Sequence, residues 1–493
     1  MELEPINKQL ALKKLSLAIA LAASAAVLSG CGGSSSSNDH DHSEIDTEGR
    51  LAIYDSTGSQ LKVMNLDDAS ILQQFALDGE APRLYRSPDA RFGIVTQRGN
   101  DLVSFIDSGL YTEDHGDHMH DYAETPSLLS LTLNDHRPTH YSLGEDYGVV
   151  FYDGSASVAS AKVTVFSDHS LESNNVIASL DRDNNMHGVA KMIGNRLFVT
   201  RRDSSITDTT LPAEVERYRL DDGSFTHEHL YAEQCPRLHG AAANDHALAF
   251  GCSDGVLVID LEDDTFPAEK LGNPPSLIDG NRIGTLVAHH EVDTLVGIAG
   301  NQLFVINPDG VEPYLELTLD EGVDRLAQGF DGHGETFYVF GNDGKLRLFD
   351  PADSWSLVAT LDVMEPLAEG SKVAFTESGS EDRLFALTPD GKSIIEIDTH
   401  DREIVRTIAL DFTASHHNVC FFQLLIMEMI AMGFFQVDPA ITCTYGPLRG
   451  EAIHGRGIPA LMVIRGMGVL VQLVGVEVFT AQGQLLLADI AAR

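Results

Sequence analysis

Three imidazoles and four carboxylates lie within nine consecutive residues, from Glu113 to Asp121. Groups of these two kinds are ligands for borderline divalent metals, zinc above all. A shorter cluster, His40-Asp41-His42, lies closer to the N-terminus. Because the chain has 20 histidines, a solvated loop without a metal is the alternative. Metal binding is therefore the first hypothesis, and its candidate ligands in the longer cluster are His115, Asp117, His118 and His120.

Residues 1–30 have the pattern of a bacterial export signal. Three lysines precede an apolar run, Leu15 to Leu28, that is too short for a permanent membrane span. The run ends in Leu-Ser-Gly-Cys31, which resembles the lipoprotein signal and predicts lipid attachment to the Cys31 thiol. An ordinary secretory signal with a chance cysteine is the alternative. Residues 31–50, rich in Gly, Ser, Asp and His, are expected to form a flexible tether. We therefore expect a periplasmic protein that is anchored to the membrane by its lipid alone.

Two of the five cysteines are expected to form a disulfide. Disulfides persist outside the cytoplasm, and Cys235 and Cys252 fall at the two ends of one hairpin-like segment. Cys31 is assigned to the lipid, and no role is assigned to Cys420 or Cys443.

The net charge of −41, from 74 acidic and 33 basic residues, excludes some partners. Nucleic acid is not expected to bind, because its phosphates require a basic protein surface. Anionic lipid is likewise not expected to bind the protein itself. Solubility or a salty habitat accounts for most of the acidity, so no metal site is inferred from charge.

One pattern repeats from residue 51 to about residue 410. An apolar strand, a turn of Gly, Asp or Asn, and a second apolar strand that usually ends in Asp recur every 40 to 55 residues or so. Short strands at this period predict an all-β chain folded as a β-propeller over residues 51–419, with eight blades and seven as the alternative. A single blade cannot bury both of its faces, so neighbouring blades must stack around an axis.

The ring is expected to close with strands from both ends of the propeller. The first unit begins at Leu51 in its middle hairpin and lacks an innermost strand. The segment from Thr413 to Val419 is predicted to supply it. Residues 420–493 do not continue the pattern and are expected to be an apolar tail, either an atypical appendage or a translated frameshift.

Several histidines lie where the innermost strands of blades should begin. Innermost strands line the central channel, so equivalent positions on successive blades point toward one another. Three or four imidazoles in such positions would form a zinc site. The alternative is a water-filled channel with hydrogen-bonded histidines. His187 and His239 fit best, because each precedes a glycine, and the other candidates are His140, His333, His416 and His417.

These features together resemble the periplasmic zinc chaperones of the AztD type, over residues 40–419. The resemblance implies a β-propeller that binds zinc and passes it to the solute-binding protein of a zinc ABC importer. It also implies an accessible zinc site drawing on His115, His118 and His120, with Asp117 as a further ligand. The occluded site that it implies draws on His140, His187, His239 and His417.

Transfer by ligand exchange is consistent with a flexible donor loop that releases zinc one ligand at a time. Ligand imidazoles must be neutral, so zinc should be held more weakly at about pH 5.5 than at about pH 7.5. His40 and His42 on the tether are either a weak zinc collector or part of a plain linker.

Two other functions are compatible with an exported propeller. One is an enzyme, such as a lactonase or a quinone-dependent dehydrogenase, with its chemistry at the channel mouth. The sequence has no Gly-x-Ser-x-Gly nucleophile motif and no dinucleotide-binding glycine fingerprint in a strand-helix setting, so we expect no enzymatic activity. The other is an interaction scaffold, which need not bind zinc.

Overall fold

The structure is a computed structural model that describes residues 45–115, 119–379 and 381–422, and four short strands between residues 461 and 486. The chain divides into two compact units, Met1–Ile426 and Met427–Arg493. The predicted signal segment and most of the tether, with Cys31, His40 and His42, lie outside the described residues.

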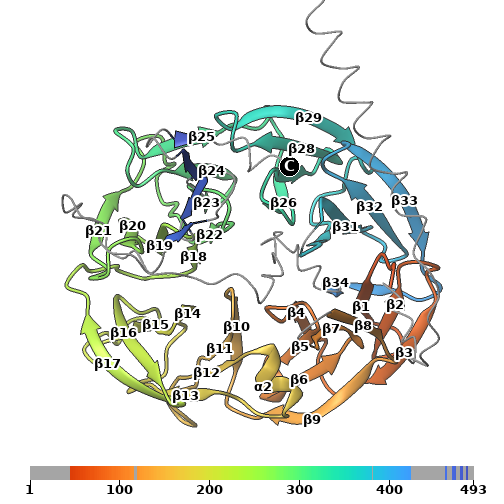
Figure 1. Ribbon diagram of the computed structural model, residues 1–493, viewed down its shortest axis with the longest axis horizontal. Helices are drawn as coiled ribbons and strands as arrows, with labels where there is room; N and C mark the ends of the chain where they lie inside the picture. Colours follow the sequence, from red (N-terminus) through yellow and green to blue (C-terminus); the bar gives the residue numbers. More distant parts are fainter. Residues whose placement is uncertain are drawn as a thin grey trace, which may run out of the picture. The chain divides into compact units, whose positions relative to one another are not determined.

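The first unit is a β-propeller of eight four-stranded antiparallel blades (Figure 1). The predicted all-β fold and blade number are therefore confirmed, and the seven-blade alternative is wrong. The weakest sequence repeats, near Gly148 and near Arg196, are complete blades as well.

Within each blade, the order of the strands is from the central channel to the outer edge. In the first four blades they are β34 (Ala414–Phe422), β1 (Arg50–Asp55), β2 (Gln60–Asn65) and β3 (Ile71–Ala76); β4 (Arg83–Arg86), β5 (Phe92–Gln97), β6 (Leu102–Asp107) and β9 (Ser127–Leu133); β10 (Pro138–Leu143), β11 (Gly148–Tyr152), β12 (Lys162–Phe166) and β13 (Ala178–Asp181); β14 (Ala190–Ile193), β15 (Arg196–Arg201), β16 (Glu214–Asp221) and β17 (Ser224–Leu230).

The last four blades follow the same order. They are β18 (Ala241–Ala243), β19 (Ala247–Cys252), β20 (Gly255–Asp260) and β21 (Ala268–Gly272); β22 (Thr285–Val287), β23 (Leu295–Ala299), β24 (Gln302–Ile306) and β25 (Tyr314–Leu317); β26 (Arg325–Phe330), β27 (Phe337–Gly341), β28 (Lys345–Asp350) and β29 (Ser356–Asp362); β30 (Ala374–Glu377), β31 (Arg383–Leu387), β32 (Ser393–Asp398) and β33 (Glu403–Ala409). Two short helices, η1 (Arg98–Asn100) and α2 (Asp168–Glu172), lie in connections between strands.

The hydrophobic core lies between blades. Each of the eight clusters of buried apolar side chains contains residues of two neighbouring blades. Val149 and Phe151 of one blade, for example, are buried with Met192 and Leu197 of the next. Full burial of one such side chain is worth about 1.5–3 kcal/mol, so each blade depends on both neighbours for its stability.

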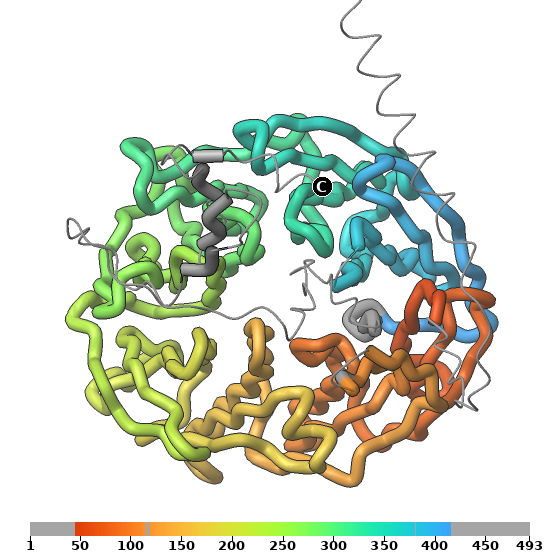
Figure 2. Tube along the Cα trace, viewed as in Figure 1, coloured from red at the N-terminus to blue at the C-terminus, as the bar shows by residue number. Residues whose placement is uncertain are grey.

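The ring closes by pairing the two ends of the propeller. β34 pairs antiparallel with β1, from Ala414 opposite Asp55 to Phe422 opposite Arg50. In Figure 2 the end of this unit lies directly beside its beginning. A buried cluster also joins Leu51 and Ile53 to Phe385 and Ile394 of the last blade. The predicted closing strand is therefore present and extends beyond Val419 to Phe422.

A two-stranded hairpin carries the histidine-acid cluster. It consists of β7 (Leu110–Asp114) and β8 (Met119–Ala123) and is inserted between β6 and β9, the two outer strands of the second blade. Arg50 holds its base, because the guanidinium donates hydrogen bonds to the carbonyls of Ser108 and Glu124. At Gly109, φ is +75° and an added Cβ would lie 2.3 Å from the Glu124 carbonyl oxygen, so only glycine fits there.

The second unit contains one described sheet. Strands β35 (Leu461–Val463), β36 (Val469–Gln472), β37 (Val478–Thr480) and β38 (Leu485–Leu486) form an antiparallel meander. It lies in the segment predicted as an apolar tail, whose role stays open. Within the described residues, no helix has the length and apolarity needed to cross a bilayer.

The predicted disulfide is present. Cys235 and Cys252, 17 residues apart, are bonded, and both side chains are fully buried. The closed loop includes His239 and β18, so the disulfide restrains the segment that enters the channel.

Replacing both cysteines with alanine should lower the free energy of unfolding by about 3 kcal/mol, because the crosslink no longer restricts the unfolded chain. The measurement is the midpoint of denaturant unfolding. A reducing agent should lower the midpoint of the parent and leave that of the variant unchanged. Equal midpoints for oxidised parent and variant would contradict the expectation.

Candidate metal centre

Three imidazoles meet at the channel end of three consecutive blades. His140 lies on β10, His187 precedes β14 and His239 precedes β18. Nε2 of His187 lies 3.2 Å from Nε2 of His140 and 3.2 Å from Nε2 of His239. All three side chains are half-buried, and one ligand nitrogen from each lies within 4.8 Å of the others. We call these residues the histidine trio.

These spacings suit a single metal ion. With Zn–N bonds of about 2.0–2.1 Å, two ligands of one tetrahedral zinc lie roughly 3.3–3.4 Å apart. The two separations that involve His187 Nε2 are close to this value, and no two ligand atoms of the trio are more than 4.8 Å apart. Three nitrogen ligands leave one tetrahedral position for a further ligand.

The backbone brings the imidazoles inward in different ways. The pairing of β10 with β11 shifts its register between Pro138 and His140. The amide of His239 donates to the carbonyl of Gly251 at 2.9 Å, which holds the segment before β18 against β19.

The glycines that follow His187 and His239 are required for two reasons. A Cβ on Gly188 would lie 2.3 Å from Thr200 Oγ1 and 2.6 Å from the Phe151 ring, so this backbone packs too closely for any side chain. Gly240 has φ of +77°, and an added Cβ would lie 2.7 Å from the carbonyl oxygen of Gly284.

Hydrogen bonds from the other ring nitrogens orient two of the imidazoles. His187 Nδ1 lies 3.0 Å from Asp153 Oδ2, and His239 Nδ1 lies 2.8 Å from the carbonyl oxygen of Gly284. Both partners are acceptors, so each Nδ1 carries the proton and each Nε2 lone pair points to the centre of the trio. Metal-binding histidines are held in this way in known sites. Arg98 also contacts Asp153 Oδ2, at 3.0 Å.

The trio favours the neutral imidazoles that metal binding requires. Burial, together with the adjacent His187, lowers the pKa of His140 from 6.5 to about 4. Burial also lowers the pKa of His239, although the hydrogen bond to Gly284 opposes the shift. Burial acts to raise the pKa of Asp153, but hydrogen bonds from His187 and Arg98 outweigh it and lower the pKa. An ionised carboxylate therefore lies close to two imidazoles, His140 and His239, whose neutral forms burial favours.

The other predicted channel histidines are placed differently. His417 lies on β34, but its side chain, like that of His416, is outside the described part of the chain. The fourth predicted ligand of the occluded site therefore stays a prediction. His333 belongs to another cluster, since its Nδ1 lies 2.9 Å from Asp382 Oδ1.

The hairpin brings two histidines of the predicted accessible site together. The rings of His115 and His120 have centroids 4.8 Å apart. His115 Nε2 lies 3.5 Å from Glu113 Oε2 and 3.4 Å from the hydroxyl of Tyr122. Asp117 and His118 lie outside the described residues, so the structure describes two of the four predicted ligands of this site.

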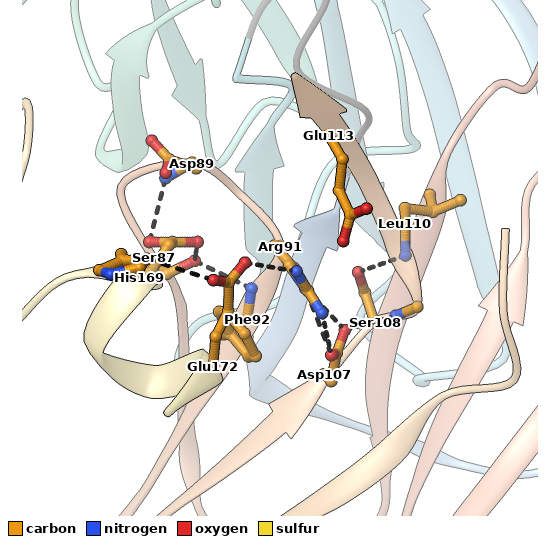
Figure 3. A network of polar contacts seen from close by, with 12 residues as sticks. Ser87, Asp89, Arg91, Phe92, Asp107, Ser108, Leu110, Glu113, His169 and Glu172 are labelled. Carbon is orange, nitrogen blue, oxygen red and sulfur yellow. Dashed lines mark hydrogen bonds and ion pairs between the residues drawn. The ribbon is translucent and has the colours of Figure 1, made fainter. Parts of the chain in front are cut away.

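The base of the hairpin is anchored to the propeller rather than loose. Arg91 forms an ion pair with Asp107 at 2.8 Å and with Glu172 at 2.7 Å (Figure 3). Its guanidinium also lies 3.8 Å from the centroid of the Tyr111 ring, which stacks on Tyr122 across the hairpin. The hairpin that carries His115, directly after β7, and His120, on β8, is thus held in place at its base, which the expectation of a flexible loop did not include.

Comparison with known proteins agrees with this architecture. No family model matches the chain. The zinc chaperone AztD of Citrobacter koseri is 25% identical over 312 residues, which cover 62% of this chain and 70% of AztD. The chain is a homologue of AztD. The resemblance stated from the sequence is therefore confirmed.

The solved structures of AztD share the fold. The apo structure and a second structure of Citrobacter koseri AztD both have a TM-score of 0.64, at 20% and 21% identity, and cover 76% of this chain and 98% of AztD. The dihydro-heme d1 dehydrogenase NirN has a TM-score of 0.51 at 11% identity, and the match covers 76% of this chain and 75% of the NirN chain. At these identities the likeness concerns the fold alone.

The sequence did not single out the two groups that orient the trio. Asp153 directly follows β11, the first apolar strand of its unit, whereas the aspartate of the repeat usually ends the second, so the repeat gave no signal for it. Gly284 acts through its carbonyl, which any residue type would supply, so no signal existed.

Replacing Asp153 with alanine should weaken zinc binding at the trio by roughly 10- to 100-fold, because His187 loses the group that orients it. Asp153→Asn, which keeps an acceptor oxygen, should lose less. Competition with a chromophoric chelator measures both affinities. Asp181→Ala removes an exposed carboxylate of the same blade and serves as the control. An Asp153→Ala affinity equal to that of the control would exclude the orienting role.

The lowered pKa values of His140 and His239 predict a weaker pH dependence of zinc binding at the trio than ordinary imidazoles would give. Three ordinary imidazoles with pKa of about 6.5 would lose roughly a thousandfold in affinity between about pH 7.5 and 5.5. The fall at the trio should be much smaller, because His140 stays neutral until about pH 4. Zinc competition on a His115→Ala/His118→Ala/His120→Ala variant follows the trio without the contribution of the hairpin site. A thousandfold fall would contradict the prediction.

Folding must be monitored in the same experiment. The His140 imidazole takes up a proton near pH 6.5 in the unfolded chain, but only near about pH 4 in the folded chain. Acidification through that window therefore favours unfolding. Circular dichroism at each pH separates loss of zinc from loss of structure.

Proposed function

We propose that this protein is an extracytoplasmic zinc chaperone that binds zinc in its propeller channel and transfers it to another protein. The observation that carries the proposal is the convergence of three Nε2 atoms in a homologue of AztD. Zinc is the cargo rather than a resident cofactor. The acceptor in this proposal is the solute-binding protein of a zinc ABC importer, and the protein works in the periplasm, anchored through lipid on Cys31.

The two sites have different parts in this proposal. The trio is half-buried and two of its imidazoles are oriented by hydrogen bonds, so it suits retention of zinc. His115 and Glu113 on the hairpin are exposed, so the hairpin suits capture and release by ligand exchange. His118 and Asp117 complete that site, and His417 is the fourth ligand of the trio.

Neutral imidazoles support reversible zinc binding. A site of three neutral nitrogens leaves the charge of the ion uncompensated, so an acceptor with anionic ligands can compete for it. Asp153 supplies one negative charge next to the ligands, and Arg98 contacts the same oxygen and offsets it. These contacts favour a site that holds zinc and still releases it.

An enzymatic role is the competing proposal. Hydrolytic zinc sites also use three histidines and an open position, and NirN is a dehydrogenase on a similar fold. Zinc transfer distinguishes the two functions, since a catalytic site keeps its metal through the reaction.

The first test is zinc content and zinc competition on the purified protein. The variants are His187→Ala, His115→Ala/His118→Ala/His120→Ala, and the control His169→Ala, whose side chain is 92% exposed. Each of the first two should lose one zinc site, with affinity at that site weakened more than about tenfold. The zinc-loaded parent should then transfer zinc to a zinc-binding acceptor protein faster than zinc dissociates into a chelator.

If neither variant differs from the control, the histidines do not bind zinc and the chaperone proposal fails. If zinc binds but leaves at the same rate with acceptor and with chelator, direct transfer fails while zinc binding stands.

A further inference from the structure

A second group of metal-ligand side chains lies outside the trio and the hairpin. Glu335, Asp382 and His400 come from three loops of the last two blades, between β26 and β27, between β30 and β31, and between β32 and β33. One ligand atom from each lies within 4.8 Å of the others. These three residues are called the loop triad here.

The contacts within the loop triad are ion pairs that are longer than hydrogen bonds. His400 Nδ1 lies 3.7 Å from Glu335 Oε2 and 3.9 Å from Asp382 Oδ2. Both separations exceed the usual hydrogen-bond range of about 2.7–3.2 Å. They approach the roughly 3.4 Å between two ligands of one tetrahedral ion, so a small movement of two exposed side chains completes the site.

A buried polar network fixes the three loops relative to one another. The Asp331 carboxylate, 1% exposed, accepts from the hydroxyl of Thr399 at 2.8 Å and from the amide of Thr336 at 3.1 Å. The amide of Thr399 in turn donates to the Asp382 carbonyl at 2.8 Å. Thr336 directly follows Glu335, Thr399 directly precedes His400, and Asp382 is itself a member of the loop triad. The network therefore gives the triad a rigid base.

A histidine outside the triad, His333, orients the Asp382 carboxylate. His333 Nδ1 donates to Asp382 Oδ1 at 2.9 Å, while Oδ2 faces His400. This contact leaves Oδ2 available to an ion and holds the carboxylate plane in position. Ligating carboxylates are commonly hydrogen-bonded in this manner.

We propose that the loop triad binds a divalent cation of the zinc class. Its donor set of one imidazole and two carboxylates suits zinc or manganese and neutralises the charge of the ion. Glu335 and His400 have side chains 66% and 68% exposed, so the ion is reached directly from solvent and exchanges quickly. The proposal does not depend on the trio or on zinc transfer.

The test is protection of His400 from carbethoxylation by diethyl pyrocarbonate, read by mass spectrometry with zinc as the probe. At zinc about ten times the Kd, mass action leaves roughly one-tenth of the sites free, so the His400 rate should fall roughly tenfold. His169 is the internal control, because it is 92% exposed and lies 3.4 Å from a single carboxylate, Glu172. Its rate should not change.

The matched variant is Glu335→Gln/Asp382→Asn, which keeps side-chain size and removes both carboxylates. Zinc at the same concentration should no longer protect His400 in this variant, with circular dichroism confirming the fold. Equal zinc sensitivity of His400 and His169 in the parent would overturn the proposal. Full protection of His400 in the variant would overturn it as well, because the carboxylates would then not be ligands.

Discussion

The antiparallel pairing of β1 with β34 is the constraint on which the rest of the molecule depends. It joins the residues around 50 to those around 420 and places Leu51 and Ile53 against the last blade. A closed ring of eight blades fixes the direction in which every innermost strand enters the channel. His140, His187 and His239 are separated by about fifty residues of sequence, and their Nε2 atoms meet because three consecutive blades are held at fixed angles. An open stack of the same blades would leave their relative angles undetermined.

Electrostatic conditions inside the channel differ from those of the whole chain. The net charge is −41, yet the trio consists of three half-buried imidazoles with one carboxylate beside them. Burial depresses the pKa of His140 and His239, which weakens the competition between proton and metal at these two imidazoles. Acidic surface can attract cations without setting their affinity, whereas affinity at the trio depends on desolvated rings in fixed tautomers. The hairpin differs again, because its exposed groups keep contact with water.

Much of the architecture was predictable because a propeller repeats one local pattern. Alternation of apolar strands and Gly/Asp turns identified the blades, including the weak copies at β11–β12 and β15–β16. The position of a histidine at a blade entrance then predicted three members of a cluster that the structure brings together. The groups that orient them were not predictable to the same degree. Asp153 and Gly284 act across blade boundaries, and hydrogen bonds between blades leave no periodic trace in a sequence. The loop triad was missed for a similar reason, since its members come from three connections of unrelated sequence.

The sequence by itself determined the fold class, favoured eight blades over seven, and predicted the closing strand and the disulfide. It also named six candidate histidines at the channel, three of which the structure brings together. Each of these follows from local spacing, because strand period, turn residues and cysteine position act over short stretches of chain. Only the tertiary structure decided which imidazoles share a centre, which nitrogen of each faces it, and how burial shifts their protonation. Those properties depend on angstrom-scale distances between blades, which the packing of buried side chains sets once the ring has closed.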